Sequence, residues 1–166
     1  MARHSDAAAP LSKFRAFVEA TPRGRLEEIY TGAFDLDATC HPYVGYHLFG
    51  ESYKRSVFLL ELKERYRAQG YIANDKDLPD RLSILLRFLS MSDDVSLAQE
   101  IIGEALIPAL DKMAKKKGGE DVDEPRGGSR PYQDVLLTLQ ILLQQLQFAP
   151  DREREAGYAG GKADVC

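Results

Sequence analysis

Cys40, His41 and His47 are the residues whose types could bind a metal ion or attack a substrate. Cys40 and His41 are adjacent in the chain, and His47 lies about one and a half helical turns further on, which differs from the ligand spacing of compact zinc sites. Neighbouring side chains of a turn or helix point apart, so His41 is poorly placed to activate the Cys40 thiol. We therefore expect a buried thiol and two structural histidines, one of them hydrogen-bonded, and no metal.

Other motifs with a known chemistry are missing from the sequence. There is no H-E-x-x-H or C-x-x-C, and the pairs Gly118-Gly119 and Gly127-Gly128 do not follow a strand as a nucleotide-binding loop would. The carboxylate pairs Glu27-Glu28 and Asp93-Asp94 fall on expected helix faces and starts, where they are solvated or favour the helix dipole. We expect no enzymatic activity and no bound cofactor.

Composition and charge restrict the class of protein further. The chain has 166 residues, 44% hydrophobic and 29% charged, with a net charge of -4 and a pI of about 5.4. This is an ordinary globular composition, and its acidity speaks against nucleic-acid binding. Two cysteines form no disulfide framework, no segment resembles a signal peptide, and no run reaches the roughly 18 apolar residues of a membrane span. We expect a soluble cytoplasmic protein without membrane insertion.

Apolar residues recur at spacings of three and four along almost the whole chain, which is typical of helices. The patterns predict helices over about 11–20, 22–34, 43–49, 52–69, 81–91, 95–115 and 131–147. No segment alternates as a strand, so we expect an all-α, single-domain bundle of about six helices. The broad apolar stripe of the last helix suggests that it lies at the centre of the core.

Several residues predict where these helices begin and end. Thr21 is expected as an N-cap before Pro22 at the first helical position, and Ser92 or Asp93 as the cap of a later helix. Gly50 and Gly70 are expected just after helix ends. Pro108 predicts a kink or a break.

The domain organisation follows from changes in composition. We expect a helical domain over residues 1–150, interrupted at 115–130 by a flexible loop of sequence KKKGGEDVDEPRGGSR. Residues 151–166 form a charged tail with little to bury, which we expect to be mobile.

The segment 42–55, PYVGYHLFGESYKR, contains three tyrosines, a phenylalanine and two glycines. Tyrosine combines a large apolar face with a hydroxyl group and is enriched where proteins bind proteins. Gly45 and Gly50 permit close backbone approach. Either these rings fill the core between two helices, or they form a binding surface.

The tetrapeptide Leu78-Pro79-Asp80-Arg81 reads as a helix start, with Asp80 in the first turn favouring the dipole. At the mouth of a groove, Asp80 and Arg81 could also orient a charged peptide.

The segment YTGAFDLDATCHPYVGYHLFGESYKRSVFLLELKERYRAQGY, followed by DKDLPDRLSILLRFLS, closely resembles the nitrate reductase molybdenum cofactor assembly chaperones, also called nitrate reductase delta subunits. They belong to the wider group of redox-enzyme maturation chaperones. The resemblance covers about 26–91 and is specific in the order of its motifs.

The resemblance implies an all-helical chaperone that is not an enzyme. Such a protein binds the apo catalytic subunit of a molybdenum oxidoreductase through its N-terminal segment and keeps it competent for insertion of the bis-molybdopterin guanine dinucleotide cofactor before membrane docking. A groove receiving an amphipathic helix is a known mode of such recognition. We expect the peptide contacts to come from Tyr43, Tyr46, His47, Phe49, Glu51, Tyr53, Asp80 and Arg81.

The chain departs from the family pattern in two places. Arg81 stands where the family usually has histidine, and since arginine does not titrate near neutral pH, a pH-tuned release at this position is not expected. The part before Leu26 matches poorly, which could alter one wall of the groove.

The resemblance leaves the client and the assembly state open. The client could belong to a respiratory nitrate reductase or to a related selenate, chlorate or ethylbenzene enzyme. A helical subunit bound permanently in such a complex is the alternative from another class. Either a monomer or a dimer is compatible with the sequence.

Overall fold

Helices make up most of the described part of the chain. The structure, a computed structural model, describes residues 5–36, 40–73, 76–114 and 130–147. The elements are α1 (Ser5–Ala20), α2 (Arg23–Thr31), η1 (Gly32–Leu36), α3 (Val44–Phe49), α4 (Tyr53–Ala68), α5 (Leu82–Met91), α6 (Val95–Glu100), η2 (Ile101–Leu106), α7 (Ile107–Ala114) and α8 (Arg130–Gln147). Within these ranges the only extended pairing is one isolated bridge, so the predicted all-α class is confirmed.

The segments α6, η2 and α7 run on without a break and form the central helix of the bundle. Pro108 follows η2, a π-helical turn, so the predicted irregularity is a widened turn and not a break. A proline lacks the N–H and crowds the carbonyl four residues earlier, and a π-helical turn changes that hydrogen-bonding pattern. The buried residues of this helix are Ile101, Ile102, Ala105, Leu106, Ala109, Leu110 and Met113.

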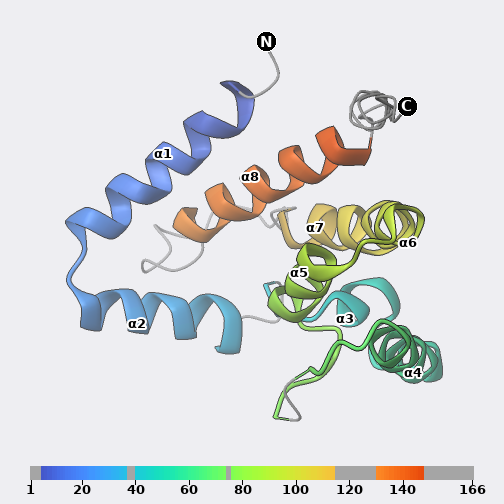
Figure 1. The fold of residues 1–166 in the computed structure, drawn as a ribbon. Coiled ribbons are helices and arrows are strands. Elements are labelled where there is room, and N and C mark those ends of the chain that lie inside the picture. Colours follow the sequence, from blue (N-terminus) through green and yellow to red (C-terminus); the bar gives the residue numbers. More distant parts are fainter. Residues whose placement is uncertain (1–4, 37–39, 74–75, 115–129, 148–166) are drawn as a thin grey trace, which may run out of the picture.

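The expectation that α8 lies at the centre of the core is confirmed in part, since Leu136 and Leu143 belong to the core cluster. α8 lies alongside α1 (Figure 1) and also packs on α7, so its broad apolar stripe is divided between two neighbours. Leu136 and Leu143 are buried, whereas Leu142 and Leu146 are exposed.

An aromatic cluster around Tyr132 joins the two ends of the described chain. The Tyr132 ring lies 5.7 Å from Phe14 of α1, 5.8 Å from Tyr30 of α2 and 5.0 Å from Phe34 of η1, measured between centroids. The cluster therefore connects α1, α2 and η1 to α8.

Two glycines end helices as predicted. Gly50 has φ 64° and follows α3, and Gly70 has φ 67° just after α4. Beyond Gly70 the Tyr71 N–H donates to the Tyr66 carbonyl at 2.8 Å, and the Gly70 N–H donates to the Arg67 carbonyl at 3.1 Å. These two bonds, with the Tyr66 and Tyr71 rings 5.2 Å apart, form a Schellman motif.

Two predicted caps are wrong. The Thr21 hydroxyl donates to the Phe17 carbonyl at 2.6 Å, so it completes the end of α1, and the N-cap of α2 is Pro22. The cap of α6 is Asp94, whose carboxylate accepts from the Leu97 N–H at 3.0 Å. The second error is of one or two positions, because neighbouring polar residues can serve as alternative caps.

Two expectations concern residues outside the described ranges. These are the loop at 115–130, apart from Arg130 at the start of α8, and the tail at 151–166. No helix among the described residues is long and apolar enough to span a membrane.

Candidate functional site

The two motifs singled out in the sequence meet at the start of α3. The backbone of Tyr43 bridges that of Arg81 in antiparallel fashion. The Val44 N–H donates to the Asp80 carbonyl at 2.8 Å, and the Leu82 N–H donates to the Pro42 carbonyl at 2.7 Å. The bridge therefore holds the aromatic segment 42–55 against the tetrapeptide 78–81.

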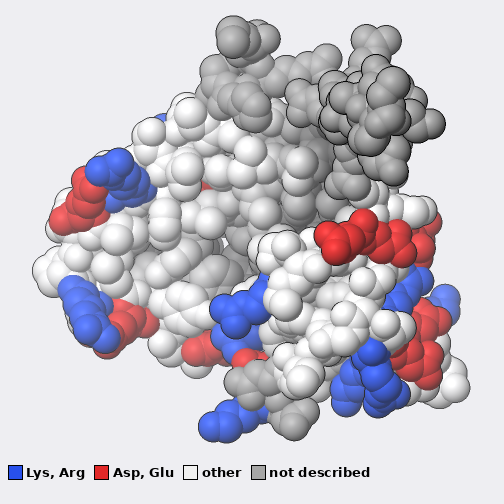
Figure 2. All heavy atoms as spheres, in the orientation of Figure 1, with Lys and Arg blue, Asp and Glu red and all other residues white. Residues whose placement is uncertain are grey.

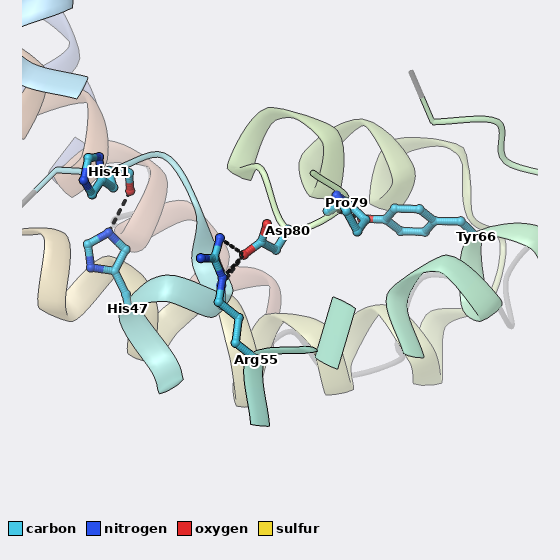
Figure 3. Close-up of polar contacts among 7 residues, drawn as sticks. His41, His47, Arg55, Tyr66, Pro79 and Asp80 are labelled. Carbon is cyan, nitrogen blue, oxygen red and sulfur yellow. Dashed lines mark hydrogen bonds and ion pairs between the residues drawn. The ribbon is translucent and has the colours of Figure 1, made fainter. Parts of the chain in front are cut away.

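Asp80 occupies the centre of this contact. Its side chain is fully buried, and Oδ2 accepts from the Gly45 N–H at 3.1 Å and from Nε and Nη2 of Arg55, each at 3.3 Å (Figure 3). The prediction that Asp80 lies in the first turn of a helix is wrong, because it precedes Arg81, the N-cap of α5. Its carboxylate serves the first turn of α3 instead.

Gly45 allows the carboxylate to come this close. A Cβ atom at this position would lie 2.8 Å from Asp80 Oδ2 and 2.9 Å from Cδ1 of Phe58. Both neighbours are too near for a real side chain, and the carboxylate is buried. The expected close backbone approach at Gly45 is confirmed.

Burial dominates the electrostatics of Asp80. Desolvation raises the pKa of this carboxyl above its ordinary value, although Arg55 and the Gly45 N–H act in the opposite direction. Among the described residues, Oδ1 of Asp80 has no hydrogen-bond partner. The pair with Arg55 therefore compensates the buried charge only in part.

Arg55 is the residue that the sequence analysis missed. Its guanidinium lies 5.8 Å from the ring centroids of both Tyr43 and Tyr46, and its side chain is 16% exposed. The only signal in the sequence is a cation close behind several aromatic residues, a combination that occurs often by chance. The structure shows that Arg55 links the tyrosines to Asp80.

The two histidines have structural contacts. Nε2 of His47 lies 2.7 Å from the His41 carbonyl, and Nδ1 of His41 lies 3.3 Å from the Phe34 carbonyl. The pKa of His47 is lowered, mainly by desolvation. Cys40 is buried, with its Sγ 4.0 Å from the Met113 carbonyl. These positions confirm the expected buried thiol and hydrogen-bonded histidine, and no set of three metal-ligating side chains occurs in the described ranges.

The remaining expected contact residues lie outside this network. Phe49 packs on Phe58 with 5.5 Å between centroids and is 37% exposed. Glu51 and Tyr53 are exposed at the start of α4. Arg81 pairs with Asp77 at 2.6 Å. The structure thus brings Tyr43, Tyr46, His47 and Asp80 together and bridges the backbone of Arg81 to Tyr43. It leaves Phe49, Glu51, Tyr53 and the side chain of Arg81 apart from them.

None of the four aromatic residues of the segment belongs to the buried core. Tyr43 and Tyr46 are half-buried, while Phe49 and Tyr53 are exposed. The alternative that these rings simply fill the core is therefore wrong for this set. Their faces remain accessible in part for other contacts.

A small groove lies between α3, α4 and the central helix. Its volume is about 190 Å³. The groove is lined by apolar side chains, namely Leu48, Phe49, Phe58, Leu62, Ile101 and Ala105. The charged residues that also line it are Glu61, Arg65, Glu100 and Glu104. Tyr43, Tyr46, Arg55 and Asp80 do not line this groove.

The described architecture is an all-α bundle in which a buried ion pair and a short bridge join the two motifs. The chain is 31% identical over 80 residues to the "probable nitrate reductase molybdenum cofactor assembly chaperone NarJ" of Bacillus subtilis (strain 168). The aligned part is 48% of this chain and 43% of the relative, so the chain spans less than half of the relative's length in this match. No family model and no solved structure matches the chain.

Proposed function

We propose that this chain is a molybdenum cofactor assembly chaperone that binds the apo catalytic subunit of a respiratory nitrate reductase. The similarity to the Bacillus subtilis relative carries the proposal, since that relative is named as a probable nitrate reductase molybdenum cofactor assembly chaperone. The all-α fold and the meeting of the two motifs at the start of α3 support it. The role is that of a binding protein without catalysis or a cofactor of its own.

In this proposal the chain holds the client's N-terminal segment until the cofactor is inserted and before the client docks at the membrane. Tyr43, Tyr46 and His47 contribute their accessible edges. Asp80 is fully buried, so it holds Arg55 and α3 in position and does not touch the client.

We assign the remaining members of the expected set a different role in binding the client. Phe49 and Tyr53 offer apolar faces, and Glu51 and Arg81 offer charges that orient the segment. Selenate, chlorate and ethylbenzene enzymes of the same molybdenum class are the other candidate clients.

Affinity capture from the organism that encodes this chain tests the proposal. The tagged chain is expected to retain the catalytic subunit of the nitrate reductase when cofactor synthesis is blocked and to release it when the cofactor is restored. Capture of a selenate, chlorate or ethylbenzene type subunit would redirect the proposal to that client. Stoichiometric recovery with the mature, cofactor-loaded complex would instead identify a permanent structural subunit.

A further inference from the structure

The connection between α4 and α5 holds an isoleucine almost entirely in water. Ile72 is 93% exposed. Its neighbour Tyr71 packs inward, with its ring centroid 5.2 Å from that of Tyr66 and 5.6 Å from that of Phe88. The Tyr71 N–H also donates to the Tyr66 carbonyl at 2.8 Å. The packing of Tyr71 therefore leaves Ile72 on the outside of the turn.

Cationic side chains of two helices flank this connection. Two hollows adjoin it, and Ile72 lines both of them. Lys63 and Arg67 of α4 line the first hollow, and Arg87 of α5 lines the second. All three cations are exposed, and none forms an ion pair with a described residue. The segments 70–73 and 76–79 extend away from the bundle (Figure 1), and basic side chains lie on both sides of them (Figure 2).

The acidic residues nearby do not cancel this charge. Asp77 lines both hollows but is paired with Arg81, with 2.6 Å between Oδ1 and Nη1. Glu64 lies on α4 and lines neither hollow. The two hollows together are therefore positively charged, on a chain whose net charge is -4.

Further apolar surface lies beside Ile72. Met91 lines the second hollow and is 65% exposed, and Leu78 is 42% exposed. An exposed apolar patch rimmed by polar residues is typical of a contact with a protein or a membrane. A nucleic acid would pair with the cations but would leave Ile72 and Met91 in water.

The arrangement of apolar and cationic groups favours a lipid surface. An apolar side chain that projects from the bundle can enter the boundary between headgroups and acyl chains. Lysine and arginine have long apolar stems, so their charges can remain at the level of anionic headgroups on either side of it. The positive charge beside Ile72 complements such a surface, whereas the rest of the chain is acidic.

We propose that the connection between α4 and α5 is a contact site for an anionic lipid surface. Ile72 and Met91 enter the interface, and Lys63, Arg67 and Arg87 bind headgroup phosphates. The contact is peripheral and needs no membrane-spanning helix. It goes beyond the chaperone function proposed above and does not depend on it.

Cosedimentation of the full chain with phospholipid vesicles tests the site. Wild type is expected to bind vesicles of phosphatidylglycerol and phosphatidylcholine in equal parts, and not to bind phosphatidylcholine alone. Binding is expected to weaken as salt rises from about 0.1 M to about 1 M, since the Debye length falls from about 10 Å to about 3 Å. Each cation contributes a factor of about five, so Lys63→Glu/Arg87→Glu should bind at least about 20-fold more weakly.

A matched variant controls for net charge. Lys13→Glu/Lys54→Glu makes the same charge change at two exposed cations that form no ion pair with a described residue. It is expected to bind the anionic vesicles nearly as well as wild type. Circular dichroism confirms that both double variants are folded.

A tryptophan at the tip tests the apolar part of the contact. The chain contains no tryptophan, so Ile72→Trp introduces a single fluorophore. Its emission is expected to shift to shorter wavelength with the anionic vesicles, because the ring leaves water. Leu11→Trp, at an exposed position of α1, is the control and should keep its emission. Ile72→Ser should weaken vesicle binding about tenfold.

Three results would overturn the proposal. Equal binding of anionic vesicles by wild type and Lys63→Glu/Arg87→Glu would locate the lipid contact elsewhere. Binding without a shift of the Ile72→Trp emission would mean that charges adsorb and no side chain enters the interface. Absence of vesicle binding would exclude a lipid contact, and binding of poly-glutamate through the same cations would then assign the surface to an acidic protein. The capture experiment for the chaperone function uses no lipid, so either proposal can fail without the other.

Discussion

Arg55 and Asp80 form an ion pair that is largely shielded from water. The Asp80 side chain is fully buried and that of Arg55 is 16% exposed. Removing both charges from water is costly, and attraction at 3.3 Å compensates only in part, since Oδ1 of Asp80 has no hydrogen-bond partner in the described part of the chain. The pair is therefore better explained by the position it imposes on α3 and the tyrosines than by a gain in stability.

Loss of Arg55 is expected to leave an uncompensated buried carboxylate. Arg55→Met should lower the free energy of unfolding at pH 7 by about 3–5 kcal/mol. The folded-state pKa of Asp80 is raised by burial and rises further without Arg55. A raised carboxyl pKa means that the folded state holds its proton more tightly, so stability is gained as the pH falls through that pKa and lost as it rises. The defect should therefore shrink as the pH is lowered from 7 towards 4.

Urea unfolding of wild type and Arg55→Met across this pH range measures the effect. Lys54→Met, which removes an exposed charge from the preceding position of α4, is the control and should unfold like wild type at each pH. A defect of constant size across the range would contradict the buried-carboxylate explanation.

Substitution of Gly45 tests the close approach directly. Gly45→Ala places a methyl group against the carboxylate of Asp80 and the ring of Phe58, and should cost about 1–3 kcal/mol of unfolding free energy. Gly24→Ala is the matched control, because nothing lies within 4 Å of its Cβ position in α2, and alanine favours helices. Thermal unfolding of both variants gives the comparison, and equal stability would show that α3 can shift without penalty.

At the scale of elements, the end of α4 depends on a glycine in the left-handed region. Gly70 has φ 67° and no neighbour within 4 Å of its Cβ position, so any cost of substitution comes from the backbone. Gly70→Ala should lower the unfolding free energy by about 1 kcal/mol and loosen the Tyr66–Tyr71 contact. Hydrogen exchange at the Tyr71 amide should quicken. Unchanged protection there would mean that the Schellman motif does not need glycine.

Local signals in the sequence were sufficient to predict the helices. The spacing of apolar residues predicts the described helices. Gly50 and Gly70 mark the ends of α3 and α4, because a backbone with φ above zero favours glycine whatever its surroundings. Seven continuous helices occur in the described ranges, close to the expected number of about six. Boundaries were less accurate, as at Thr21, whose hydroxyl bonds the end of α1 and not the start of α2.

Contacts between distant residues were not visible in the sequence. Asp80 was assigned to the helix that follows it because only local neighbours can be considered in a sequence, whereas its carboxylate bonds Gly45 and Arg55 of other elements. The role of Arg55 depends on the same meeting of segments. The way that α8 divides its apolar stripe between α1 and α7 likewise depends on packing, which apolar periodicity alone does not determine.

At the scale of the whole molecule, the contact between the two motifs joins α3 to α5. The bridge between Tyr43 and Arg81, with the pair Arg55–Asp80 beneath it, fixes α3 relative to α5. In the proposed function, this support would keep the accessible edges of Tyr43 and Tyr46 in a fixed position for a client segment.

The measurement that tests the central claim most directly is a calorimetric titration of the purified chain with the N-terminal peptide of the nitrate reductase catalytic subunit from the same organism. A scrambled peptide is the control. We expect binding at micromolar concentration or tighter, lost on scrambling. No heat of binding from pH 6 to 8, with the folded chain confirmed, would contradict recognition of that segment and with it the chaperone function proposed for this chain.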